Sequence, residues 1–123
     1  MDEEVVIKKV LDCAFKVHTA LGPGLLESAY EECLAYEISK NGLKVERQKA
    51  LPLIYEEIKM DAGYRVDLLI EGCVIIEIKA VECFTDVHLA QIITYLRLSN
   101  CHKGLLINFN VAHLKSGIKR VAL

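Results

Sequence analysis

The sequence predicts an α/β protein in which one mixed β-sheet is covered by helices. Three observations support this class: helical spacing of apolar residues up to residue 40, strand-like patterns between residues 44 and 81, and a further helix and strand before residue 110. The expected order of elements is ααβββαβ. A chain of 123 residues is short for two domains, and we expect residues 1–123 to form one.

The first two elements are predicted helices. Residues 3–21 place apolar side chains at helical spacing, with glutamates and lysines between them. Gly-Pro-Gly at 22–24 ends this helix because proline fixes φ and has no amide to donate. A second helix is expected over residues 25–40, and Asn-Gly at 41–42 is its predicted end, since both residues tolerate a left-handed backbone.

The pattern then changes to that of strands. Residues 44–55 and 64–71 are expected to be strands, with a polar turn near 56–59 between them. Residues 73–81 (CVIIEIKAV) are nearly continuously apolar and rich in β-branched side chains, which is typical of a strand buried on both faces. Gly72 marks a tight hairpin between the last two strands.

The last part of the chain predicts one more helix and one more strand. Helical spacing returns over residues 85–99, with Thr85 or Asp86 available as the N-cap. Residues 104–109 are expected to form a strand, and residues 115–123 a short basic tail.

Composition narrows the class of protein. The chain is 53% hydrophobic and 26% charged, which excludes intrinsic disorder. No apolar run approaches the roughly 20 residues of a membrane span, and the acidic first residues lack the basic character of a signal peptide, so we expect a cytoplasmic protein without membrane contact. The net charge of −2 predicts modest, salt-sensitive affinity for nucleic acid, not tight non-specific binding.

Two charges interrupt the most apolar predicted strand. Glu77 and Lys79 are one residue apart, so the period of two places both side chains on the same face of the sheet. Charges buried in such a strand cost several kcal/mol each unless they are paired or bind a metal ion. A simple Glu–Lys pair at the edge of the sheet is the alternative to a functional site.

Asp67 is a second carboxylate inside a predicted strand, where aspartate is uncommon. If the following hairpin has a three-residue loop at 71–73, Asp67 lies directly opposite Glu77 on the same face. A two-residue loop would place the two carboxylates on opposite faces. Carboxylates that face each other repel, and a divalent cation relieves that repulsion.

An aspartate, a glutamate and a lysine that converge in this way suit metal-assisted hydrolysis of phosphodiester bonds. Carboxylate oxygens favour Mg²⁺ or Mn²⁺, which activates water and offsets charge on the phosphate. The lysine stabilises the charge that develops in the transition state or orients the water.

The spaced motifs resemble a known group of proteins. Asp67 with Glu-Ile-Lys at 77–79 is similar to the signature of the PD-(D/E)XK nuclease superfamily, and residues 24–30 (GLLESAY) resemble the hallmark of its GxxExxY family. Further matching stretches occur along almost the whole chain: His18, residues 21–24, residues 64–67, His88, Gln91, residues 94–96, residues 106–109 and residues 117–120.

The resemblance implies a restriction-endonuclease-like fold and a role for each matching residue. Glu27 would be a helix-borne acid that contacts the metal or its water. Asp67 and Glu77 would be metal ligands, with the backbone carbonyl of Ile78 as a candidate third ligand. Lys79 would be the catalytic cation.

Two further side chains belong to the implied site. Gln91 and Tyr95 are four residues apart on one helical face and resemble the Gln-x3-Tyr feature that some superfamily members direct towards the site and DNA. Tyr30, by contrast, falls on an apolar helical face, which favours a core aromatic whose hydroxyl is hydrogen-bonded.

The resemblance implies a metal-dependent nuclease that uses Mg²⁺ or Mn²⁺ and acts on nucleic acid, with DNA as the expected substrate. The alternative is a nucleic-acid-binding or regulatory module that keeps the fold without cleavage. One compact domain offers little surface for gripping a duplex, so a homodimer is also expected.

Overall fold

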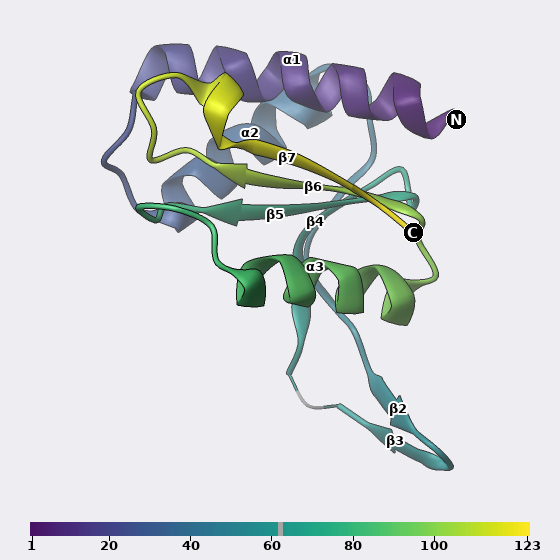
Figure 1. Cartoon of the computed structure of the whole chain (residues 1–123). Helices are drawn as coiled ribbons and strands as arrows, with labels where there is room; N and C mark the ends of the chain where they lie inside the picture. The colour runs from purple at the N-terminus through teal and green to yellow at the C-terminus, as the bar shows by residue number, and fades with distance from the viewer. Residues whose placement is uncertain (62) are drawn as a thin grey trace.

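The computed structural model describes residues 1–61 and 63–123. It shows a five-stranded sheet of order β1-β4-β5-β6-β7, with α1 and α2 on one face and α3 on the other (Figure 1). The β5–β6 pair is parallel and the other pairs are antiparallel, so the predicted α/β class with a mixed sheet between helices is confirmed. The elements are α1 (Glu3–Leu21), α2 (Glu27–Lys40), β1 (Val45–Ala50), β2 (Leu53–Tyr55), β3 (Ile58–Met60), β4 (Arg65–Ile70), β5 (Val74–Lys79), α3 (Asp86–Ser99), β6 (Lys103–Asn108), a 3-10 turn (Leu114–Gly117) and β7 (Ile118–Ala122).

The central strand β5 explains the two-layer core. Val74, Ile76 and Ile78 pack in the cluster that includes α1 and α2, while Ile75 packs in the cluster that includes α3. All of β5 except Lys79 is buried. A strand covered on both faces needs apolar side chains at nearly every position, which is the pattern of the sequence.

The helix ends follow from local hydrogen bonding. The Asp2 carboxylate accepts hydrogen bonds from the amides of Glu4 and Val5 at the start of α1. Of the two N-cap candidates for α3, Thr85 is the cap, and it forms a reciprocal pair of hydrogen bonds with His88. Helix α2 begins two residues later than expected, at Glu27. It ends at 41–42, where Gly42 has a φ of 85°. Within the described part of the chain, no helix has both the length and the apolar character needed to cross a membrane.

The prediction of one continuous strand over residues 44–55 is wrong, because this segment forms two strands, β1 and β2. It breaks at residues 51–52 because Pro52 has no amide to continue a ladder. Strand β2 pairs with β3 instead, through a turn at Glu56, whose φ is 51°. This β2–β3 hairpin extends away from the main sheet beside α3 (Figure 1).

The prediction of a short basic tail over residues 115–123 is also wrong, because Ile118–Ala122 form β7, the fifth strand of the sheet. After the 3-10 turn, β7 pairs with β6 from the Ile107–Ile118 pair to the Lys103–Ala122 pair. Its two exposed bases, Lys119 and Arg120, suit an edge strand, where charges discourage pairing with another chain.

Gly117 provides a test of the packing behind β6. A Cβ at this position would overlap the backbone carbonyl oxygen of Asn108, which cannot move without disturbing the end of β6. We expect Gly117→Ala to lower the free energy of unfolding by roughly 1–3 kcal/mol, the cost of overpacking. Urea unfolding measures it, with exposed Lys115→Ala as the control. Equal stability of the two variants would contradict this packing.

Candidate active site

The candidate site forms where β4 and β5 diverge. Their ladder contains the pairs Leu68–Ile76, Leu69–Ile75 and Ile70–Val74. This register is the one expected from a three-residue loop, and it confirms that interpretation over the two-residue loop. The next positions beyond the Leu68–Ile76 pair are Asp67 and Glu77.

The two carboxylates replace the ladder at this point. The amide of Asp67 donates to Oε2 of Glu77 at 2.8 Å, and the amide of Ile78 donates to Oδ2 of Asp67 at 2.8 Å. Each side chain therefore accepts a backbone hydrogen bond from the other strand. The diverging strands stay joined, and both carboxylates are held at the same place.

Burial makes this arrangement electrostatically unfavourable without a cation. Burial, reinforced by the nearby Asp67 carboxylate, raises the pKa of Glu77 to about 8. Burial also raises the pKa of Asp67, although the hydrogen bond from Ile78 opposes the shift. Among residues 1–61 and 63–123, neither carboxylate forms an ion pair. A positive charge between them would remove the repulsion.

The donor set fits a hard divalent cation. Within the described residues, no three acidic, histidine or cysteine side chains are placed to hold a metal ion by themselves, so the arrangement does not fit a closed zinc site. Mg²⁺ requires less from the protein, because it keeps several waters and uses one or two carboxylates together with substrate phosphates. Asp67 and Glu77 meet that requirement.

Lys79 follows on the same face of β5 and contacts α3. Its Nζ donates to Oε1 of Gln91 at 3.3 Å. In the part of the chain that the structure describes, Lys79 has no ion-pair partner, so the simple Glu77–Lys79 pair does not form. Tyr95, one turn after Gln91, has a raised pKa because of burial and, secondarily, the carboxylates of Glu77 and Asp67. The structure thus brings Gln91 and Tyr95 to the same site.

Glu27 approaches the end of β5 from the face of the sheet that α2 covers, opposite to α3. It is the first residue of α2, and its Oε2 accepts a hydrogen bond from the amide of Ala80 at 3.0 Å. Ala80 directly follows Lys79, so Glu27 reaches the carboxyl end of β5. It also lines a cleft of about 450 Å³ that includes Asp67.

Tyr30 explains the spacing of the motif at residues 24–30. Its hydroxyl donates to the Gly22 carbonyl at 2.6 Å and accepts from the Leu25 amide at 3.1 Å. The ring is fully buried and stacked on Phe109, with centroids 4.6 Å apart. Gly24, with a φ of 101°, allows the loop to turn back towards the helix. Tyr30 is therefore the core aromatic that the sequence predicts, and it ties down the loop that delivers Glu27.

Asn108 supports the other side of the same strand end. This buried residue accepts a hydrogen bond from the Val81 amide at 3.1 Å and donates one to the Val81 carbonyl at 2.8 Å. The Phe109 amide donates to the Lys79 carbonyl at 3.0 Å. The chain that follows Lys79 is thus fixed against β6.

Sequence reasoning missed two polar residues of the cleft. Glu31 is buried, and its Oε1 accepts a hydrogen bond at 2.5 Å from Gln48, which also donates to Oδ1 of Asp67 at 3.3 Å. Arg47 pairs with Oε2 of Glu31 at 3.1 Å. Glu31 could have been found, because it lies four residues after Glu27 and so on the same helical face. Gln48 gave no such signal: it faces Asp67 through a backbone distortion, with a φ of 49°.

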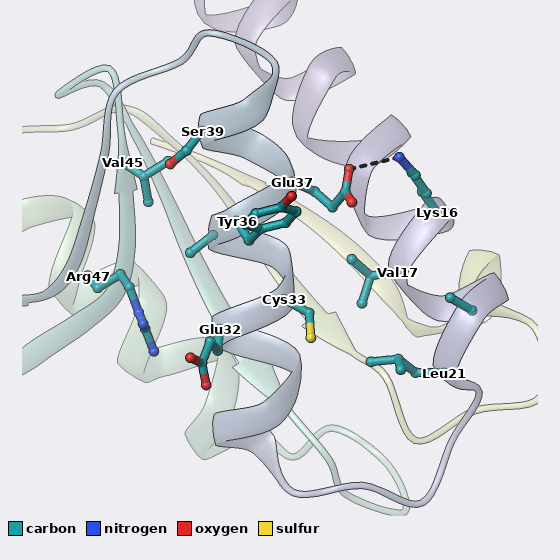
Figure 2. Close-up of a pocket in the computed structure, with 12 residues that line it drawn as sticks. Lys16, Val17, Leu21, Glu32, Cys33, Tyr36, Glu37, Ser39, Val45 and Arg47 are labelled. Carbon is teal, nitrogen blue, oxygen red and sulfur yellow. Dashed lines mark ion pairs between the residues drawn. The ribbon is translucent and has the colours of Figure 1, made fainter.

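A separate groove of about 740 Å³ lies between α1 and α2 and contains none of the predicted site residues. Figure 2 shows Val17, Leu21 and Cys33 pointing into it, with the ion pair of Lys16 and Glu37 (3.1 Å) above them. Asp67, Glu77 and Lys79 do not line this groove; they lie where β4 and β5 diverge.

Together, the fold and the site define an α/β protein that presents two carboxylates and a lysine where its central strands part. The model of the PD-(D/E)XK nuclease superfamily matches residues 4–121, and the chain belongs to this superfamily. No curated protein and no solved structure matches the chain.

Tyr30→Phe tests the tie between the loop and α2. The substitution keeps the ring on Phe109 but leaves the Gly22 carbonyl and the Leu25 amide without their partner. We expect the free energy of unfolding to fall by roughly 1–3 kcal/mol. Tyr36→Phe, at an exposed tyrosine of the same helix, is the control for urea unfolding. A Tyr30→Phe protein as stable as that control would show that the hydroxyl does not hold the loop.

The raised pKa of Glu77 predicts how stability changes with pH in EDTA. Because the folded protein holds this proton up to about pH 8 while the unfolded chain releases it near pH 4.5, stability falls as pH rises between these values. Glu77→Gln removes this dependence, and we expect it to be more stable than the wild type at pH 8 by an amount on the order of a few kcal/mol.

The measurement is urea unfolding at a series of pH values, with Glu82→Gln, at an exposed glutamate, as the control. Addition of Mg²⁺ should restore wild-type stability at high pH and leave Glu77→Gln unchanged. A constant difference between wild type and Glu77→Gln at all pH values would contradict the raised pKa of the buried Glu77 carboxyl.

Proposed function

We propose that this protein is a metal-dependent nuclease of the GxxExxY family that hydrolyses phosphodiester bonds in DNA. The observation that supports it best is the pair of carboxylates, buried Glu77 and half-buried Asp67, each of which accepts a backbone hydrogen bond from the other strand, with Lys79 next on the same face of β5. Membership of the nuclease superfamily supports nucleic acid as the substrate class.

Each side chain has a distinct part in the proposal. Asp67 and Glu77 would hold Mg²⁺ or Mn²⁺, with the carbonyl of Ile78 as a further ligand. When bound, such an ion supplies Lewis-acid stabilisation of the phosphate and lowers the pKa of water. Lys79 would stabilise the negative charge that develops on the phosphate, and Glu27 would accept a hydrogen bond from the attacking water and so orient it.

Gln91 and Tyr95 act on this centre from α3. The hydrogen bond from Lys79 to Oε1 of Gln91 fixes the direction of the ammonium group. Tyr95 is close enough to Glu77 and Asp67 for their charges to contribute to its raised pKa, after the larger effect of burial.

A second function is favoured by the net charge of −2. A nuclease that grips a long stretch of substrate neutralises many phosphates with basic side chains, and a chain of net charge −2 is poorly suited to that task. The second candidate is a module that keeps the fold without cleavage and acts in regulation or in weak, salt-sensitive binding of nucleic acid.

Cleavage assays separate the two functions. Purified protein is incubated with single-stranded, duplex and branched DNA and with RNA, in Mg²⁺, Mn²⁺ or EDTA. We expect metal-dependent products from DNA, and a loss of roughly 100- to 1000-fold in Lys79→Ala, since one stabilising group is removed. Glu77→Ala should abolish cleavage.

Lys119→Ala, at an exposed lysine of β7, is the matched control and should cleave as the wild type does. Unchanged cleavage by Lys79→Ala would show that the site is elsewhere. Binding of DNA in EDTA without products in any metal would favour the non-cleaving module.

The proposal also covers assembly and location. A homodimer would double the surface available for gripping DNA, and sedimentation of the protein on its substrate tests it, since a monomer on substrate would remove this part of the proposal. A cytoplasmic location is supported by the five free thiols, which stay reduced in that compartment.

A further inference from the structure

We propose that a neutral pocket beside the site receives one unstacked base of the substrate strand, so that the protein acts on single-stranded nucleic acid or on frayed ends. This inference rests on the proposed nuclease function and names its substrate class. The pocket lies between α3 and the start of the β2–β3 hairpin.

The pocket has an aromatic and apolar lining. Its volume is about 260 Å³, and its walls include Leu53 and Tyr64 on the hairpin side and Val87 and Tyr95 on α3. The rings of Tyr64 and Tyr95 are tilted by 58°, with centroids 6.4 Å apart. Among the described residues, no charged side chain lines this pocket. It therefore suits a planar, uncharged group and not a phosphate.

The pocket adjoins the proposed catalytic centre through Gln91. Gln91 lines it and also contacts Nζ of Lys79 at 3.3 Å. Tyr95 lines it too, and its pKa is raised in part by the carboxylates of Glu77 and Asp67. A phosphate beside Lys79 and a base in the pocket would thus be separated by one side chain, which matches neighbouring parts of one nucleotide strand.

Arg65, which directly follows Tyr64, supplies a positive charge near the proposed path of the substrate strand. Nη1 of Arg65 donates to the carbonyl of Gln48 at 3.5 Å, next to the cleft that contains Asp67. A strand that crosses the end of the sheet would meet this guanidinium near the carboxylates and the tyrosine rings near α3. The two basic side chains, Arg65 and Lys79, would contact the backbone, and the tyrosine rings would contact one base.

Only an unpaired base can enter such a pocket. In a duplex, stacking covers both faces of a base and pairing occupies its edge, so the base must leave the helix first. Tyr64 is 43% exposed and Val87 74% exposed, so the mouth of the pocket is open to an incoming ring. Aromatic contact of this kind tolerates any base, because every base has a π-face.

The test is a binding measurement that does not require cleavage. Fluorescence anisotropy in EDTA at low salt compares three probes: a short labelled single strand of DNA, the same strand with one abasic position moved along it, and a blunt duplex of the same sequence. We expect the single strand to bind more tightly than the duplex, and one abasic position to weaken binding to the wild type.

The variants assign this effect to the pocket. Tyr64→Ala should weaken single-strand binding by roughly 5- to 100-fold and should no longer respond to the abasic position. Tyr64→Phe should bind as the wild type does. Val87→Glu, an exposed change in the first turn of α3 that the helix tolerates, should weaken binding by placing a charge at the mouth. Tyr36→Ala, at a tyrosine 64% exposed on α2, is the control.

Equal affinity for duplex and single strand, or an abasic effect that is the same in the wild type and in Tyr64→Ala, would overturn the inference. Either result with metal-dependent cleavage intact would leave the nuclease proposal standing. The expected base effect without cleavage in any metal would support the pocket and contradict the nuclease.

Discussion

The hydrogen bonds exchanged between β4 and β5 where their ladder ends are the constraint on which the site depends. Strands that part normally leave their amides to water, yet here the amides of Asp67 and Ile78 bind the carboxylates of Glu77 and Asp67. The opening between the strands and the placement of the acids therefore have a single cause. Any change that closes the opening would also displace the acids.

The rest of the fold keeps this opening rigid. Strand β5 is buried on both faces, so its end cannot move without disturbing the packing on both sides. Tyr30 ties the loop before α2, and Asn108 ties the segment after Lys79, so the carboxyl end of β5 is held from two directions. Glu27 then completes the enclosure through the Ala80 amide. Fixed polar groups of this kind need little rearrangement when charge develops in a reaction.

Periodicity carried most of the prediction, because it reports directly on burial. The alternation around Glu77 and Lys79 placed both on one face, and the hairpin register brought Asp67 beside Glu77. Features that depend on tertiary contacts were not predicted. The last strand has no apolar pattern of its own, and only its pairing with β6 distinguishes it from a tail. The break between β1 and β2 could have been predicted, because Pro52 cannot donate a hydrogen bond to a ladder. Gln48 was missed because an unusual φ leaves no pattern in the sequence.

The backbone at Gln48 links local strain to the polar contacts of the cleft. Residues other than glycine, asparagine and aspartate seldom adopt a backbone φ of 49°, and holding glutamine in this conformation costs about 1–2 kcal/mol. Glycine at this position would relax the strain, but it would remove the side-chain amide that donates hydrogen bonds to Glu31 and Asp67. A substitution that relaxes the backbone at residue 48 would therefore give up the hydrogen bonds to Glu31 and Asp67, so backbone strain and these polar contacts are linked at this one residue.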